Sequence, residues 1–179
     1  MKATGIVRRI DDLGRVVIPK EIRRTMRIRE GDPLEIYTEK DGEVIFKKYS
    51  PMGELSDFAG QMCDTIGKTT GVPVAICDRD SFIAVSGAPR RDIYGKQISG
   101  ELEGIMEGRQ TYCRTSGESD AVPIDDSGKY RATVAAPILS GGDVMGCVLF
   151  FTEGGSVAGE VEHKLAQTVA TFLGKQMES

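Results

Sequence analysis

The residues best suited to chemistry are the arginines and lysines near the N-terminus. The chain of 179 residues has 23 basic and 27 acidic residues, a formal net charge of −4, and this total alone does not suggest a nucleic-acid binder. Residues 1–29, however, hold nine basic and three acidic side chains, a balance of +6, whereas residues 51–179 carry −7. Cationic groups at this density neutralise phosphates and release their counterions. The first segment is therefore predicted to bind a polyanion.

The cysteines give little indication of a metal or redox centre. They are spaced 14, 36 and 34 residues apart, at Cys63, Cys77, Cys113 and Cys147. This spacing matches neither a zinc-ligand pair nor a Cys-x-x-Cys motif, and His163 is the only histidine. We therefore expect small buried side chains and no metal or other cofactor. Thiol catalysis is a weak alternative, because only Cys113 has a cationic residue, Arg114, directly beside it.

The elements that must position the basic side chains are short. β-Branched residues predict strands over residues 4–10 and 15–18, joined by a turn over residues 11–14. Pro19 suits the first position of a helix, predicted over Lys20–Ile28 with Gly31 as its C-terminal cap. Strands over residues 34–38 and 43–47 flank an Asp-Gly hairpin turn. This β-β-α-β-β order offers few large apolar side chains, so we expect a homodimer with interdigitated strands.

Five runs of this segment closely resemble the AbrB family of bacterial transition-state regulators. They are Thr4–Arg9, Asp12–Pro19, Glu21–Arg24, Leu34–Tyr37 and Lys47–Tyr49. In that family the segment forms a swapped-hairpin dimer whose basic face binds DNA. The resemblance implies double-stranded, AT-rich promoter DNA as partner, read by shape as well as by base contacts. By position it also implies the DNA-contacting residues, which are Arg8, Arg15, Arg23 and Arg24, with Lys20 assisting.

The MazE-like antitoxins have a similar β-β-α-β-β segment, followed by a disordered acidic tail that binds a toxin. The remainder of this chain is long and patterned for folding, which argues against an antitoxin. The composition changes at Tyr49-Ser50-Pro51-Met52-Gly53, a run typical of a chain break. Two domains are predicted, residues 1–52 and residues 53–179.

Apolar periodicity predicts a folded second domain. A helical stripe runs from Met52 to Ile66, and Gly71 ends it. Strands are predicted over residues 72–77, 82–87, 130–139 and 144–152, and helices over residues 89–94, 100–107 and 157–177. The order and pattern resemble a GAF domain, with Val74–Asp78, Ala136–Ile138 and Gly146–Leu149 as the similar strands. The predicted fold class is α+β, an AbrB-like swapped-hairpin domain followed by an α/β GAF-like sensor domain.

The combination of these two domains resembles regulators of late sporulation genes in spore-forming bacilli. It implies a cytoplasmic, nucleoid-associated transcription regulator whose second domain senses an unknown small effector, drives oligomerisation, or does both. Apolar stripes on the first and last helices of that domain favour their pairing between dimers, which gives a homotetramer. No membrane partner is expected, because no stretch approaches the ~18 apolar residues of a spanning helix.

Two alternatives to this non-enzymatic regulator stay open. The first is an effector-binding or oligomerisation module with no direct role on DNA. The second is a thiol reductase on the GAF fold, of the kind that reduces free methionine sulfoxide.

Overall fold

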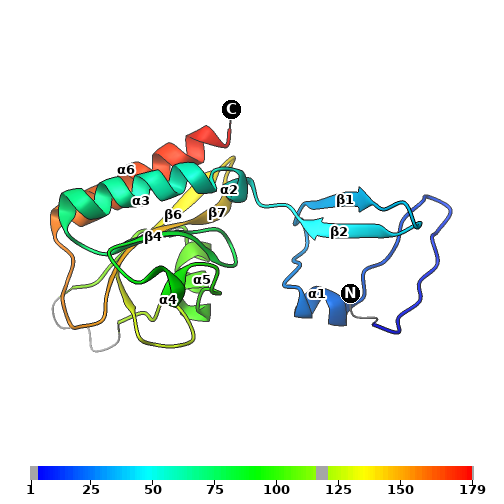
Figure 1. Ribbon diagram of the computed structural model, residues 1–179, viewed down its shortest axis with the longest axis horizontal. Coiled ribbons are helices and arrows are strands. Elements are labelled where there is room, and N and C mark those ends of the chain that lie inside the picture. Colours follow the sequence, from blue (N-terminus) through cyan, green and yellow to red (C-terminus); the bar gives the residue numbers. More distant parts are fainter. Residues whose placement is uncertain (1–3, 116–120, 179) are drawn as a thin grey trace. The chain divides into compact units, whose positions relative to one another are not determined.

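The computed structural model describes residues 4–115 and 121–178, and the chain folds as two compact units (Figure 1). The first unit, residues 1–49, is called the head, and the second, residues 50–179, is called the body. The division falls in the Ser-Pro-Gly run that the sequence marks as a chain break. Ser50 begins the body as the N-cap of α2, where its side chain accepts a hydrogen bond from the Gly53 N–H.

The head contains one helix and one hairpin among its described residues. The helix α1 spans Lys20–Thr25, and the strands β1 and β2 span Leu34–Thr38 and Val44–Lys48. The two strands pair antiparallel with Ile36 opposite Phe46, and Gly42 takes the positive φ of 84° that the turn requires. The predicted second hairpin is therefore present, shifted by one residue in β2.

Residues 4–10 and 15–18 are not strands in the single chain, although the sequence predicts strands there. They run as an irregular segment, drawn without arrows in Figure 1. A strand needs a neighbour to satisfy its backbone N–H and C=O groups, and nothing in the described part of the head pairs with these residues as a ladder. These β-branched segments therefore have no partner strand within the described part of one chain.

The helix α1 is shorter than predicted and ends without a glycine. The Ile28 N–H donates to the Arg23 carbonyl at 2.8 Å, and the Arg27 N–H donates to Arg24 at 3.3 Å. This is the bond pattern of a Schellman motif, in which the residue at C′ adopts the left-handed conformation. Arg27 occupies that position with φ 51°. The expected helical end at Ile28 and the cap at Gly31 were therefore wrong.

The head lacks a core of its own. Among its described residues only Pro19 is buried. One face of the β1–β2 hairpin carries Ile36, Val44 and Phe46, which are 61%, 58% and 42% exposed. Further exposed apolar side chains lie before α1 and directly after it, and they are Ile6, Val7, Ile10, Leu13, Val16, Val17 and Met26.

The body is built on a five-stranded antiparallel sheet in the order β4-β3-β7-β6-β5. Its strands are β3 (Val74–Cys77), β4 (Phe82–Ser86), β5 (Tyr112–Cys113), β6 (Arg131–Ser140) and β7 (Asp143–Thr152). Its helices are α2 (Pro51–Glu54), α3 (Ser56–Thr70), α4 (Arg90–Ile93), α5 (Gly100–Glu107) and α6 (Glu160–Gln176). These elements follow the predicted order closely, and Gly71 caps α3 with a φ of 69° as expected.

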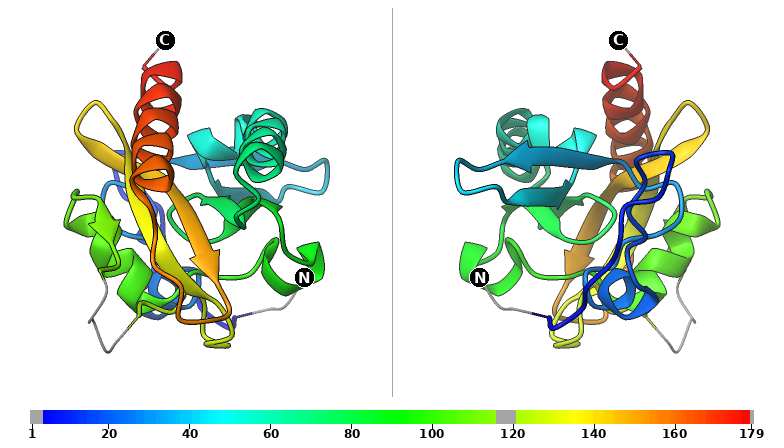
Figure 2. Two further views of the ribbon diagram at one scale, coloured as in Figure 1. Left: turned by 90° about the vertical axis from the view of Figure 1, so that its left-hand side faces the viewer. Right: turned by 90° about the vertical axis from the view of Figure 1, so that its right-hand side faces the viewer.

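The body has three layers. The helices α3 and α6 cover one face of the sheet, and α4 and α5 lie on the other (Figures 1 and 2). Because β6 and β7 are buried on both faces, their sequences are nearly continuous apolar runs rather than alternating ones. The cores on the two faces include Phe150 and Leu173 on the α3–α6 side, and Phe82 and Leu102 on the other.

Candidate nucleic-acid interface

The turn over residues 11–15 presents Arg15. The Asp11 N–H donates to the Arg15 carbonyl at 3.0 Å, and Gly14 supplies a φ of 76°. The Asp11 carboxylate accepts the N–H groups of Leu13 and Arg15 at 3.0 and 2.8 Å, as well as the Arg15 Nε–H at 2.8 Å. These bonds from Arg15 hold the pKa of Asp11 below its ordinary value. The Arg15 side chain stays 70% exposed, so its terminal nitrogens face solvent.

The helix α1 presents the other basic side chains. Lys20, Arg23 and Arg24 are all exposed, and Arg23 and Arg24 lie three and four residues after Lys20. Residues at these spacings are neighbours on a helix surface, where like charges repel each other. Glu21 is the acidic residue of the first turn. The helix therefore carries unfavourable cationic crowding, which a bound anion would relieve.

All five predicted contact residues are solvent-exposed, and they come from two parts of the head. Arg8 lies before the 11–15 turn and Arg15 is its last residue, whereas Lys20, Arg23 and Arg24 lie on α1. The hydrogen bonds of the described head residues tie Arg15 to Asp11 and join none of the five side chains to one another.

Sequence reasoning missed two supporting contacts in the head. It treated Asp11 as a turn residue, although its carboxylate also fixes Arg15. It also gave no role to Lys48, whose Nζ donates to the Arg27 carbonyl at 2.8 Å and lies 3.8 Å from an Asp32 oxygen. The Asp32 carboxylate in turn accepts the Arg29 N–H at 2.8 Å. These bonds connect the end of α1 to β2, and no residue type in the sequence signals them.

The cysteines lie in the body and are mostly buried. Burial raises the pKa of the Cys63 thiol to about 12, and it also raises that of Cys77. Cys77 and Cys147 are opposite each other on β3 and β7, both fully buried. Within the ranges 4–115 and 121–178 no three His, Cys, Asp or Glu side chains gather as a metal site.

Family models match both parts of the chain. The model described as "Stage V sporulation protein T C-terminal, transcription factor" matches residues 54–178. The model described as "Antidote-toxin recognition MazE, bacterial antitoxin" matches residues 7–53.

Individual relatives agree with these matches. Stage V sporulation protein T of Bacillus subtilis (strain 168) is 52% identical over 178 residues, 99% of either chain. Transition state regulatory protein AbrB of the same organism is 57% identical over 63 residues, which cover 32% of this chain and 65% of AbrB. The GAF domain of an Acinetobacter phosphoenolpyruvate-protein phosphotransferase superposes with a TM-score of 0.52 at 13% identity, covering 73% of this chain and 84% of that one.

The AbrB-like head and the GAF-like fold of the body together define a transcription factor of mixed α and β structure. More particularly, the chain belongs to the stage V sporulation protein T family.

Proposed function

We propose that this transcription factor binds promoter DNA directly, through Arg8, Arg15, Lys20, Arg23 and Arg24. The observation that carries the proposal is the exposure of all five cations in a segment whose charge balance is +6. The similarity to AbrB over 63 residues supports the same assignment. Arginines on rigid elements give affinity for phosphates first and a modest share of base contacts second. The expected targets are AT-rich promoters of sporulation genes on the nucleoid.

We also propose that the head dimerises through its exposed apolar side chains. Ile36, Val44 and Phe46 form an apolar hairpin face, and the strand-like segments over residues 4–10 and 15–18 have no partner strand in the described chain. A second head with swapped hairpins would supply both the missing ladder and the missing core. Two copies would also double the five cations to ten.

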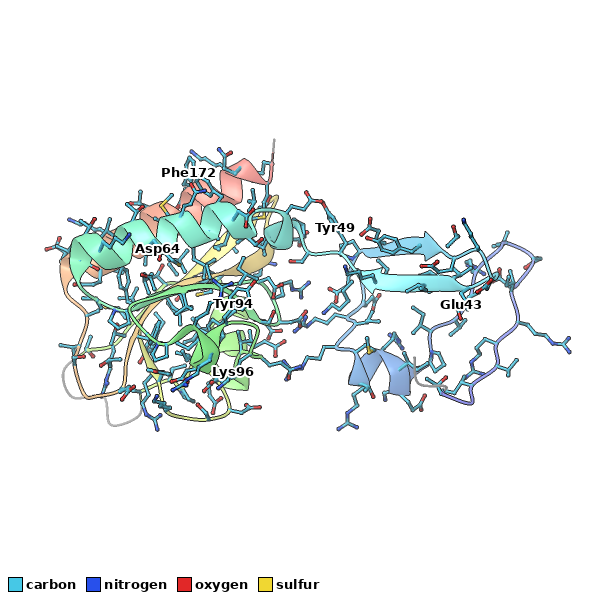
Figure 3. All side chains as sticks on the ribbon, in the orientation of Figure 1. Glu43, Tyr49, Asp64, Tyr94, Lys96 and Phe172 are labelled. Atoms are coloured by element: carbon cyan, nitrogen blue, oxygen red, sulfur yellow. The ribbon has the colours of Figure 1, made fainter. Side chains whose placement is uncertain are left out.

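The body is proposed to join dimers into a tetramer and to sense a small effector. On α3 and α6 the Phe58 and Phe172 rings lie 5.8 Å apart and are 37% and 42% exposed, and Val161 is 62% exposed. Figure 3 shows Phe172 on the side of α6 that faces away from the sheet. Pairing of these two helices with a second body would cover this surface.

An enzymatic role has less support. Of the four cysteines, Cys63, Cys77 and Cys147 are fully buried, so the half-buried Cys113 has no second accessible thiol with which to form a catalytic pair. None of the helices in the described ranges is long and apolar enough to cross a membrane. The alternative of an effector module without DNA contact does not explain the cations on α1.

Mobility-shift titration of promoter duplex with single alanine variants tests the proposal. We expect Arg8→Ala, Arg23→Ala and Arg24→Ala each to weaken binding by about tenfold or more, since each removes a cation from both heads of the dimer. The slope of log affinity against log salt should become shallower by roughly 0.9 for each phosphate that the variant no longer neutralises.

The matched control is Arg91→Ala, which removes an arginine side chain of the body that is 90% exposed. It should bind DNA as the unchanged chain does. Undiminished, salt-independent binding by all three head variants would refute direct DNA contact through this surface.

A further inference from the structure

A cavity of about 780 Å³ opens at the rim of the body's sheet. It lies where the end of β5, the start of β6, the end of β7 and the start of α5 meet, and its size is that of a small-molecule site. Its charged lining residues are Arg114, Arg131, Glu101 and Glu153, and the rest are residues 121–123 and the glycines 154 and 155.

Arg114 is incompletely bonded in this cavity. Its Nη1 lies 3.5 Å from the carbonyl oxygens of both Gly154 and Ser156, at the long limit of a hydrogen bond. Its Nε is buried and has no hydrogen-bond partner among the residues that the structure describes. A guanidinium carries five N–H donors, and a buried donor without an acceptor is unfavourable. Arg114 therefore has donors available for an incoming acceptor.

The other charged groups of the lining are already engaged or exposed to solvent. Arg131 Nη1 donates to the Ala121 carbonyl at 2.9 Å. A Glu153 oxygen lies 3.4 Å from Lys129 Nζ, which neutralises part of its charge. Glu101 is exposed at the N-terminal end of α5. The unsatisfied charged group of the cavity is thus a cation, and the exposed carboxylate of Glu101 opposes it only partly.

We propose that this cavity is the effector site of the body and that it binds a small anion, a carboxylate or a phosphate, through the Arg114 guanidinium. The proposal rests on the sensory role proposed above and names the chemical class of the effector. Planar N–H pairs of arginine fit both kinds of oxyanion. Glu101 adds a negative charge, like that of the anion, to the same lining, so its removal should tighten anion binding.

Calorimetric titration of the full chain with inorganic phosphate and with succinate, at constant ionic strength, tests the site and separates the two anion classes. We expect at least one of them to bind, Arg114→Gln to weaken that binding at least tenfold, and Glu101→Gln to strengthen it a few-fold. Arg91→Gln is the matched control and should leave it unchanged. Phosphate bound by the basic head contributes equally in all four proteins and cancels in the comparison.

Arg114→Lys keeps the charge without the planar fork, and it serves if Arg114→Gln fails to fold. The anion affinity expected for Arg114→Lys lies between that of the unchanged chain and that of Arg114→Gln. The proposal is overturned if neither anion binds, if Arg114→Gln or Arg114→Lys binds as tightly as the unchanged chain, or if Arg91→Gln weakens binding equally. A mobility shift of the unchanged chain on promoter duplex, without anion, is read separately. Absence of DNA binding there would contradict the role of the head and leave the anion result standing.

Discussion

At the scale of one residue, the left-handed conformation of Arg27 after α1 could not be predicted from residue types. Glycine is the usual residue where a helix ends in the left-handed conformation, and the sequence offers Gly31, so the prediction ended the helix at Ile28 with Gly31 as its cap. The structure instead ends α1 at Thr25 and puts Arg27 at φ 51°. The Lys48 bond to the Arg27 carbonyl joins this bend to β2, and a contact between residues 21 apart has no local signature.

Arg27→Gly is predicted to stabilise the head. The left-handed conformation costs a non-glycine residue roughly 1–2 kcal/mol, and the greater freedom of glycine in the unfolded chain offsets part of the gain, which leaves about 0.5–1 kcal/mol. Hydrogen exchange of the α1 amides at fixed protein concentration measures the change. Arg27→Ala removes the same side chain but keeps the strain, so equal protection in the two variants would contradict strain as the cause.

At the scale of elements, the body could be predicted well from its sequence and the head less well. The helix α5 spans the predicted residues 100–107, and β6 and β7 each begin or end within one residue of the prediction. These segments bury apolar side chains against the rest of their own chain, so the spacing of apolar residues in the sequence predicts them directly. The predicted strands over residues 4–10 and 15–18 have the right composition for pairing but no neighbour in the described part of the same chain.

The contact between α6 and β6 depends on a glycine. A Cβ built on Gly174 would lie 2.0 Å from the Leu139 carbonyl oxygen, closer than any real side chain comes to backbone. Gly174→Ala must therefore push the helix away from the sheet, and we predict a loss of about 1–3 kcal/mol in the free energy of unfolding. Urea unfolding followed by circular dichroism measures it.

Gly104→Ala in α5 is the matched control, because a Cβ there meets no atom within 4 Å. It should stabilise the body by roughly 0.5–1 kcal/mol through helix propensity alone. A neutral Gly174→Ala would show that the close approach of α6 to Leu139 does not hold in solution.

At the scale of the whole molecule, charge and apolar surface are divided between the two units. Residues 1–29 of the head carry +6 and the head has a large uncovered apolar surface, whereas residues 51–179 carry −7. Like charge keeps such a body away from a phosphate backbone. Counting charge by segment predicts this division, but it does not predict the rim cavity, because Arg114, Arg131 and Glu101 converge from three elements that are distant in sequence.

From the exposed aromatic pair of α3 and α6 we predict that two bodies pair through these helices and join two dimers into a tetramer. Phe172→Asp places a charge in the centre of the proposed helix-pairing surface, where burial without a partner is strongly unfavourable. Sedimentation velocity should then show dimers, held by the heads, in place of tetramers. DNA with two binding sites should be bound more weakly, since the linkage between two head dimers is broken while each head surface stays intact.

Val157→Asp is the control for this assembly prediction, because Val157 is 47% exposed in the loop before α6 and lies outside both helices. It should remain a tetramer. If Phe172→Asp also sediments as a tetramer, the bodies do not pair through α3 and α6, and the head surface would then have to account for every contact between subunits. If both variants dissociate, the contact extends beyond the two helices to the loop that precedes α6.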